Sequence, residues 1–170
     1  VPVLTDDAAP VAHRRGAVQP RPAQVGRQMQ GQALVADAPI LGAGMAPILA
    51  AQAEGRGVIF VSGHFGNYDV PRAVLSAQGH LVGGLFQPMK NPYFNDHYVA
   101  AISQIGTPLF PRGKKGLGDM VRHLRSGGML GLLMDQSMRH GAALTFFDQT
   151  AMTALSAAEL ALKYDALVIP

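Results

Sequence analysis

Short apolar runs alternate with longer mixed segments along most of the chain. Runs rich in Val, Ile, Leu and Phe, bounded by glycine, proline or polar residues, predict short buried strands. The predicted strands are Val58–Val61, Leu81–Phe86, Pro108–Phe110, Met129–Met134 and Ala166–Ile169. The predicted helices are Met45–Glu54, Tyr68–Gln78, Pro92–Ile105, Leu117–Arg125 and Thr153–Lys163, and a short apolar segment, Leu144–Phe147, follows a polar turn at Asp135–Gly141.

This alternation predicts an α/β fold. Strands joined by helices of about ten residues or more are expected to be parallel, because each crossover returns the chain to the same end of the sheet. We therefore predict a mostly parallel sheet with alternating helices. The last strand reaches Pro170 with nothing after it to cover or pair it, so we expect part of a larger domain.

The first part of the chain shows no such period. Prolines and arginines interrupt it, as in Pro20-Arg21-Pro22, and we predict a loose, disordered or non-native arm over residues 1–34 and a partial domain over residues 35–170. The apolar segment Ala33–Ala53 is broken by Asp37 and by prolines and glycines, so we do not expect a membrane-spanning helix there.

Composition narrows the chemistry. A chain of 170 residues that is 48% hydrophobic suits one globular domain with a real core. It has no cysteine, which excludes disulfides, thiolate metal sites and a cysteine nucleophile. The histidines lack metal-ligand spacing, and we expect neither a metal nor a cofactor.

The positive charge is concentrated in one region. Five cations lie within fourteen positions that hold one acid, Asp119: Arg112, Lys114, Lys115, Arg122 and Arg125. Such a cluster favours an anionic partner, which could be phosphate, an acidic carrier protein or a membrane surface, although a solvated helix face has the same pattern. Nucleic acid is not among the partners we expect.

The strongest chemical signal is the block Gly57–Asp69. A β-branched run ends in glycine, His64 follows at once, and Asp69 comes five positions later where a helix could begin. A carboxylate beside a histidine makes a candidate general base. Residues five apart do not share a helix face, so the pair requires His64 in the loop and Asp69 in the first turn. The residues alone leave open whether His64 merely packs and Asp69 merely caps.

Other polar groups also follow predicted strands. Gln87, Arg112 and Asp135 come after the second, third and fourth strands. Open α/β sheets bind ligands outside the carboxyl ends of their strands, so these groups are expected to converge with His64. A turn-forming role for Asp135 is the alternative. Asn91, before Pro92, is expected to cap the following helix.

The ordered set of motifs resembles the late acyltransferases of lipid A biosynthesis, within the broader glycerolipid and lysophospholipid acyltransferase superfamily. The resemblance runs from about Leu41 to Pro170. It rests on His64-x4-Asp69, Asn91-Pro92-Tyr93-Phe94-Asn95, Pro111–Gly116, Gly127–Gln136, Leu144–Phe147, Ala151–Ala161 and Val168-Ile169-Pro170.

The resemblance implies transfer of a fatty acyl chain from an acyl carrier protein thioester to a hydroxyl of a Kdo-bearing lipid A precursor. It places the reaction at the cytoplasmic face of a Gram-negative inner membrane. His64 would be the base and Asp69 its orienting partner, with direct attack and no acyl-enzyme. The residues implied in substrate binding are Arg112, Gly113, Lys114, Lys115, Gly116, Asp135 and Asn91.

The chain also departs from the family pattern. Relatives are about twice as long and begin with a membrane anchor, so the resemblance implies truncation at both ends. Asp148 stands where glycine is usual, in a turn that favours positive φ. Three alternatives stay open: another glycolipid or lysophospholipid acyltransferase, an inactive membrane- or carrier-binding module that uses only the basic cluster, and a hydrolase that uses the same dyad to activate water.

Overall fold

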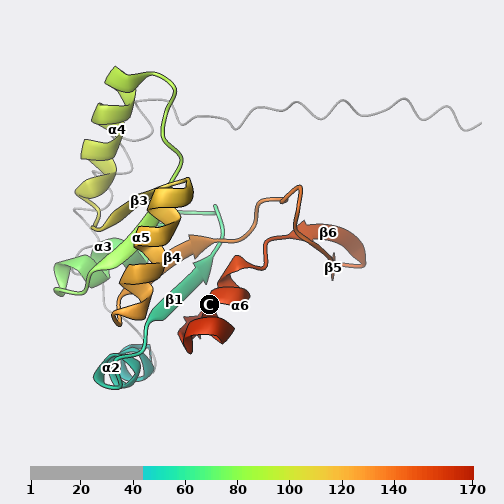
Figure 1. Cartoon of the computed structure of the whole chain (residues 1–170), viewed down its shortest axis with the longest axis horizontal. Coiled ribbons are helices and arrows are strands. Elements are labelled where there is room, and N and C mark those ends of the chain that lie inside the picture. Colours follow the sequence, from blue (N-terminus) through green and yellow to red (C-terminus); the bar gives the residue numbers. More distant parts are fainter. Residues whose placement is uncertain (1–43) are drawn as a thin grey trace, which may run out of the picture.

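The computed structural model describes residues 44–170, so the predicted arm over residues 1–34 lies outside the described part. Five strands form one sheet in the order β3-β2-β4-β1-β7 (Figure 1). Every neighbouring pair in it is parallel. The strands are β1 Val58–Ser62, β2 Val82–Phe86, β3 Leu109–Pro111, β4 Met129–Leu133 and β7 Leu167–Ile169. The predicted parallel α/β fold is confirmed.

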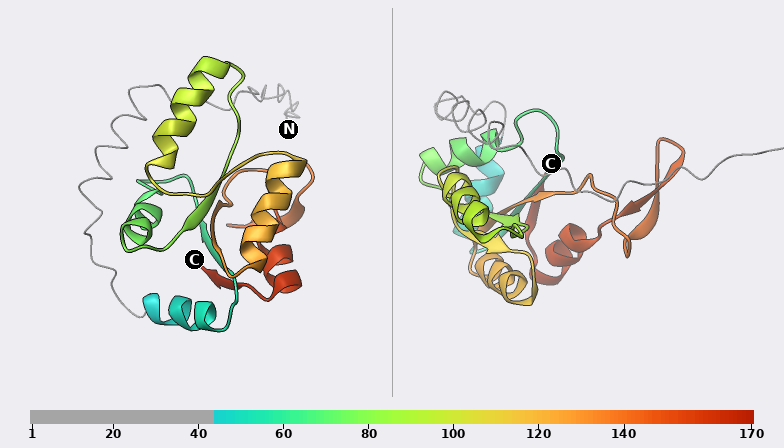
Figure 2. Two further views of the ribbon diagram at one scale, coloured as in Figure 1. Left: turned by 60° about the vertical axis from the view of Figure 1, so that its left-hand side comes forward. Right: turned by 90° about the horizontal axis from the view of Figure 1, so that it is seen from above.

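Helices cover both faces of this sheet. They are α2 Met45–Ala53, α3 Val70–Ala77, α4 Pro92–Ser103, α5 Lys114–Arg125 and α6 Ser156–Tyr164. Figure 2 shows α3 and α4 on one side of the sheet and α5 and α6 on the other. A chain that alternates strands and helices therefore builds three layers.

The core is divided by the sheet because successive strand residues point to opposite faces. Val58 packs in a cluster with Ile48 of α2 and Leu75 of α3. Its neighbour Ile59 packs in a second cluster with Leu124 of α5 and residues of α6. Both strand residues are fully buried. The continuous apolar runs seen in the sequence are thus explained by burial on both faces.

The main difference from the predicted elements is an antiparallel hairpin. It consists of β5 Ala142–Phe146 and β6 Gln149–Thr153, where the pattern had predicted only the segment Leu144–Phe147 and a helix beginning at Thr153. The two turn residues have positive φ, 48° at Phe147 and 59° at Asp148. Tight hairpins require such angles, and glycine and asparagine are their usual signal. Phe-Asp does not carry that signal, so the second strand was missed.

Helix α5 begins three residues before the predicted start. The connection that the predicted strand Pro108–Phe110 and helix Leu117–Arg125 left between them is therefore shorter, and Lys114 and Lys115 lie in the first helical turn. Gly113 precedes the helix with φ 142°, a conformation that favours glycine. Gly116 is buried, and a Cβ there would lie 1.8 Å from the Pro111 carbonyl oxygen. The helix can begin this early because its first turn packs closely against β3, with Gly116 at the contact.

Candidate active site

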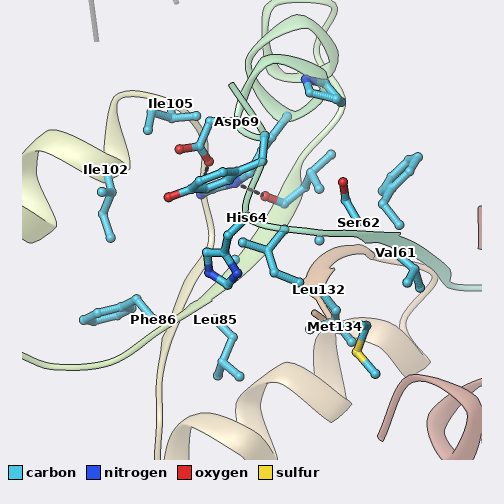
Figure 3. Close-up of a pocket in the computed structure, with 18 of the residues that line it drawn as sticks. Val61, Ser62, His64, Asp69, Leu85, Phe86, Ile102, Ile105, Leu132 and Met134 are labelled. Atoms are coloured by element: carbon cyan, nitrogen blue, oxygen red, sulfur yellow. Dashed lines mark hydrogen bonds and ion pairs between the residues drawn. The ribbon is translucent and has the colours of Figure 1, made fainter. Parts of the chain in front are cut away.

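A cavity of about 520 Å³ reaches the carboxyl ends of β1, β2, β3 and β4. That volume is in the range of sites for small organic ligands. Most of its wall is apolar, with side chains that include Val61, Leu75, Leu85, Phe86, Ile102, Ile105 and Leu132. His64, Asp69 and Arg112 line the same cavity, and Figure 3 shows His64 and Asp69 among these apolar residues. The structure thus brings three predicted site residues together.

A short hydrogen bond joins the side chains of His64 and Asp135. The imidazole Nδ1 lies 2.7 Å from Asp135 Oδ1. The backbone N–H of His64 donates to Asp135 Oδ2, also at 2.7 Å. The ring of Tyr68 meets the imidazole edge-on, with centroids 5.4 Å apart. One carboxylate therefore holds both the backbone and the side chain of His64.

The pairing of β1 with β4 explains this contact. Ser62 and Leu133 are partners in the ladder, and the N–H of Met134 donates to the Ser62 carbonyl at 2.9 Å. His64 and Asp135 follow these paired strand ends, so they lie side by side. Gly63 leaves room for the carboxylate, since a Cβ there would lie 3.3 Å from Asp135 Cγ.

These hydrogen bonds determine the protonation pattern. The bonds from the His64 ring and from its backbone N–H lower the pKa of Asp135, which keeps the carboxylate ionised at neutral pH. An ionised carboxylate only accepts hydrogen bonds, so Nδ1 carries the hydrogen. The lone pair of neutral His64 then lies on Nε2. This is the arrangement that a general base requires.

Asp69 occupies a different environment. It is the residue before α3, which begins at Val70 rather than at the predicted Tyr68, and its side chain makes no capping bond to the helix. Only 16% of the side chain is exposed, and Oδ1 lies 3.9 Å from Arg72 Nη1. Burial raises the pKa of Asp69, and the Arg72 charge opposes that rise. The predicted pairing of Asp69 with His64 stays a prediction.

Arg72 is a site residue that the sequence reasoning missed. It lines the cavity, and its guanidinium donates to the carbonyls of Val82, at 3.0 Å, and Gly106. Gly84 makes room for it, because a Cβ there would lie 3.0 Å from Arg72 Cζ. The available signal was a single charge in the otherwise uncharged helix Val70–Ala77, three residues after Asp69.

The basic residues that the resemblance implies in substrate binding lie at and just before the start of α5. Arg112 lines the cavity, and its backbone N–H donates to the Phe86 carbonyl at 2.8 Å. Lys114 and Lys115 are exposed on the first turn of the helix and are not among the lining residues of the cavity. Arg112 is therefore the member of the basic cluster that shares a cavity with His64.

Asn91 acts as the cap of α4, as its place before Pro92 predicted. Its Oδ1 accepts hydrogen bonds from the backbone N–H groups of Tyr93, at 3.0 Å, and Phe94, at 3.3 Å. This use of the side chain explains the residue without a ligand. Its predicted part in substrate binding stays a prediction.

Within residues 44–170, no helix is long and apolar enough to cross a membrane. The same described residues contain no group of three His, Cys, Asp or Glu side chains placed to hold a metal ion.

Comparison with known proteins agrees with the motif order. A family model described as bacterial lipid A biosynthesis acyltransferase matches residues 25–170. The matched range begins ahead of Leu41 and includes residues 25–34 of the predicted arm. A search of curated proteins found no match.

Proposed function

Since the chain belongs to the bacterial lipid A biosynthesis acyltransferase family, we propose that it transfers a fatty acyl chain from an acyl carrier protein thioester to a hydroxyl of a Kdo-bearing lipid A precursor. The observation that carries this proposal is the His64–Asp135 hydrogen bond beside a largely apolar cavity. It supplies a base and a place for an acyl chain in one site. The reaction would take place at the cytoplasmic face of the inner membrane.

The proposed step begins with His64. Nε2 takes the proton of the acceptor hydroxyl as its oxygen attacks the thioester carbonyl. The tetrahedral intermediate then expels the carrier thiolate, which receives that proton from the imidazolium. The new ester bond replaces the thioester bond, and no acyl-enzyme forms. Asp135 stabilises the imidazolium and keeps the hydrogen on Nδ1.

The cavity supports the choice of an acyl donor. Its apolar wall removes methylene groups from water, which favours binding by about 0.8 kcal/mol for each buried CH₂. Arg112 lines the same cavity. In this proposal it contacts an anionic part of the acceptor, because a guanidinium suits the geometry of phosphate. Lys114 and Lys115 would extend this positive surface beyond the cavity.

The two carboxylates receive separate roles. The 2.7 Å contact supports Asp135 as the partner of the imidazole. Asp69, paired at longer range with Arg72 on the cavity wall, is the partner that the family motif implies. The roles are distinguished by substituting each carboxylate in turn, as described below.

The test is an acyl-transfer assay with acyl carrier protein thioester and a lipid A precursor. His64→Ala is expected to lower the rate by about 10²–10⁴-fold, the usual contribution of a general base. His97→Ala, an exposed position on α4, is the matched control and is expected to keep the wild-type rate. Both variants should show the same melting temperature as the wild type.

Three results would contradict the proposal. Undiminished acyl transfer by His64→Ala would show that His64 is not the general base. Release of free fatty acid without acylated lipid would indicate a hydrolase. Binding of carrier protein or lipid with no transfer, unchanged by His64→Ala, would indicate a binding module.

A further inference from the structure

The β5–β6 hairpin stands apart from the rest of the described chain. Its two strands pair with each other and with no other strand of residues 44–170. Figure 1 and Figure 2 show it extending away from the helices and the main sheet. Residues 143–150 are all exposed. Because a two-stranded hairpin is marginally stable by itself in water, this one is expected to gain from a contacting surface.

The tip of the hairpin is strongly apolar. Phe146 and Phe147 are 66% and 85% exposed, and Leu144 is 46% exposed. The two phenyl rings form an edge-to-face pair with centroids 4.7 Å apart. Asp148 is the one charged residue between Ala142 and Thr153. The exposed turn of the hairpin is therefore aromatic rather than polar.

One exposed cation lies next to the hairpin in the sequence, and two more lie at the end of the sheet that carries His64. Arg139 precedes β5, is exposed, and has no ion-pair partner among the described residues. Lys90 is exposed on the connection that leaves the carboxyl end of β2, and Lys114 is exposed in the first turn of α5, which follows the carboxyl end of β3. These strand ends lie at the same end of the sheet as His64. Two more exposed aromatic residues also follow strands of this sheet: Phe65 lies on the connection after β1, and Tyr93 lies in the first turn of α4. Exposed aromatic residues together with exposed cations suit an anionic bilayer interface.

We propose that the hairpin tip, Leu144–Asp148, inserts into the interface of an anionic lipid bilayer, with Arg139 on the lipid phosphates. The phenyl rings would lie at the boundary between headgroups and acyl chains, and the cavity would open toward the same surface. Asp148 opposes anionic lipid and limits the depth of insertion. The binding itself follows from the exposed surface alone, while its use in acyl transfer rests on the proposed function.

Vesicle cosedimentation tests the contact. The full chain is expected to sediment with vesicles of phosphatidylcholine containing about one third phosphatidylglycerol, and far less with phosphatidylcholine alone. Phe146→Ser with Phe147→Ser should weaken binding by at least about tenfold. Arg139→Gln should weaken it about fivefold, and Asp148→Asn should strengthen it by a similar factor, since asparagine tolerates the positive φ of that position.

Leu162→Ser provides the matched control. Leu162 is 88% exposed on α6, as exposed as Phe147 but outside the hairpin, and its substitution should leave binding unchanged. The sequence contains no tryptophan, so Phe147→Trp adds a single reporter at the tip. Its fluorescence should shift to shorter wavelength on anionic vesicles. Circular dichroism establishes that each variant is folded.

Several results would overturn the membrane contact. These are equal binding by the double serine variant, an unshifted tryptophan spectrum, or self-association of the chain that the double serine variant abolishes while vesicle binding is absent. Acyl transfer to detergent-dispersed acceptor separates the two proposals. Transfer that persists without vesicle binding overturns the hairpin contact alone, whereas loss of transfer with intact vesicle binding counts against the proposed reaction.

Discussion

Asp69 lines the cavity that also contains His64, and Asp135 contacts His64 directly, but the environments of the two carboxylates are opposite. Asp135 is 43% exposed and accepts two short hydrogen bonds from His64, which lower its pKa. Asp69 is 16% exposed, its charge faces Arg72 at 3.9 Å, and burial raises its pKa. Asp135 is the carboxylate that is hydrogen-bonded to the imidazole, while the pairing of Asp69 with His64 stays a prediction from the motif spacing. Hydrogen-bond geometry and burial separate the two candidates.

The sharpest test of this comparison is activity. Asp135→Asn should lower acyl transfer by about 10²–10⁴-fold, because the neutral amide no longer fixes the hydrogen on Nδ1 or stabilises the imidazolium. Asp69→Asn should have the smaller effect. Steady-state rates and melting temperatures of both variants provide the measurement. The reverse order of rates, with both variants folded, would return the role to Asp69 as the motif spacing predicted.

The next largest effect is expected in stability, at Arg72. Arg72→Met removes hydrogen bonds to two backbone carbonyls and the cation that lies 3.9 Å from the buried carboxylate of Asp69, so it should lower the free energy of unfolding by about 3 kcal/mol. Denaturant unfolding measures this.

Arg122→Met is the matched control for Arg72. Arg122 pairs with Asp119 at 2.7 Å, but its side chain is 78% exposed, and its loss should change stability by less than about 0.5 kcal/mol. Equal losses in the two variants would show that burial does not distinguish the two ion pairs.

A smaller effect is expected at Asn91. Asn91→Ala removes the cap of α4 and should lower stability by about 1 kcal/mol. Acyl transfer should stay within about twofold of the wild type when it is measured well below the melting temperature. A rise in KM for the acceptor without loss of stability would instead support the substrate contact that the family resemblance implies.

The pH dependence of stability offers the finest comparison. Folding lowers the pKa of Asp135, so the ionised carboxylate stabilises the folded state. This stabilisation is present above about pH 4, the pKa of Asp135 in the unfolded chain, and is lost as the pH falls through the pKa in the folded state. The folded-state pKa of Asp69 is raised, so its ionisation reduces stability as the pH rises from about 4 through the folded value.

The two substitutions should therefore change the curve of unfolding free energy against pH in opposite directions. Asp135→Asn should flatten the acid side, and Asp69→Asn should remove a decline above about pH 4. Denaturant titrations at a series of pH values provide the measurement. Matching changes in the two variants would show that the environments are electrostatically alike.

The sequence predicted the sheet and its strand ends well because buried parallel strands carry a strong local signal. Val58–Val61 and Met129–Met134 are continuous apolar runs, and both became neighbouring central strands. Only an apolar segment of the hairpin, Leu144–Phe147, was predicted. The turn adopts positive φ at Phe147 and Asp148, and this pair of residues is not a usual signal for such a turn. The start of α5 was misplaced because Gly116 fits inside the helix through close packing with Pro111.

By itself, the sequence determined the α/β alternation, the position of His64 after the first strand, and the set of polar groups at the strand ends. Each of these depends on residues that are near one another in the chain. Only the tertiary structure decided that Asp135 reaches Nδ1 of His64, that Arg72 faces Asp69, and that the hairpin pairs with no other strand of residues 44–170. Those outcomes depend on strand order and register, which join residues as far apart as 64 and 135, and on burial, which exists only after the chain has folded.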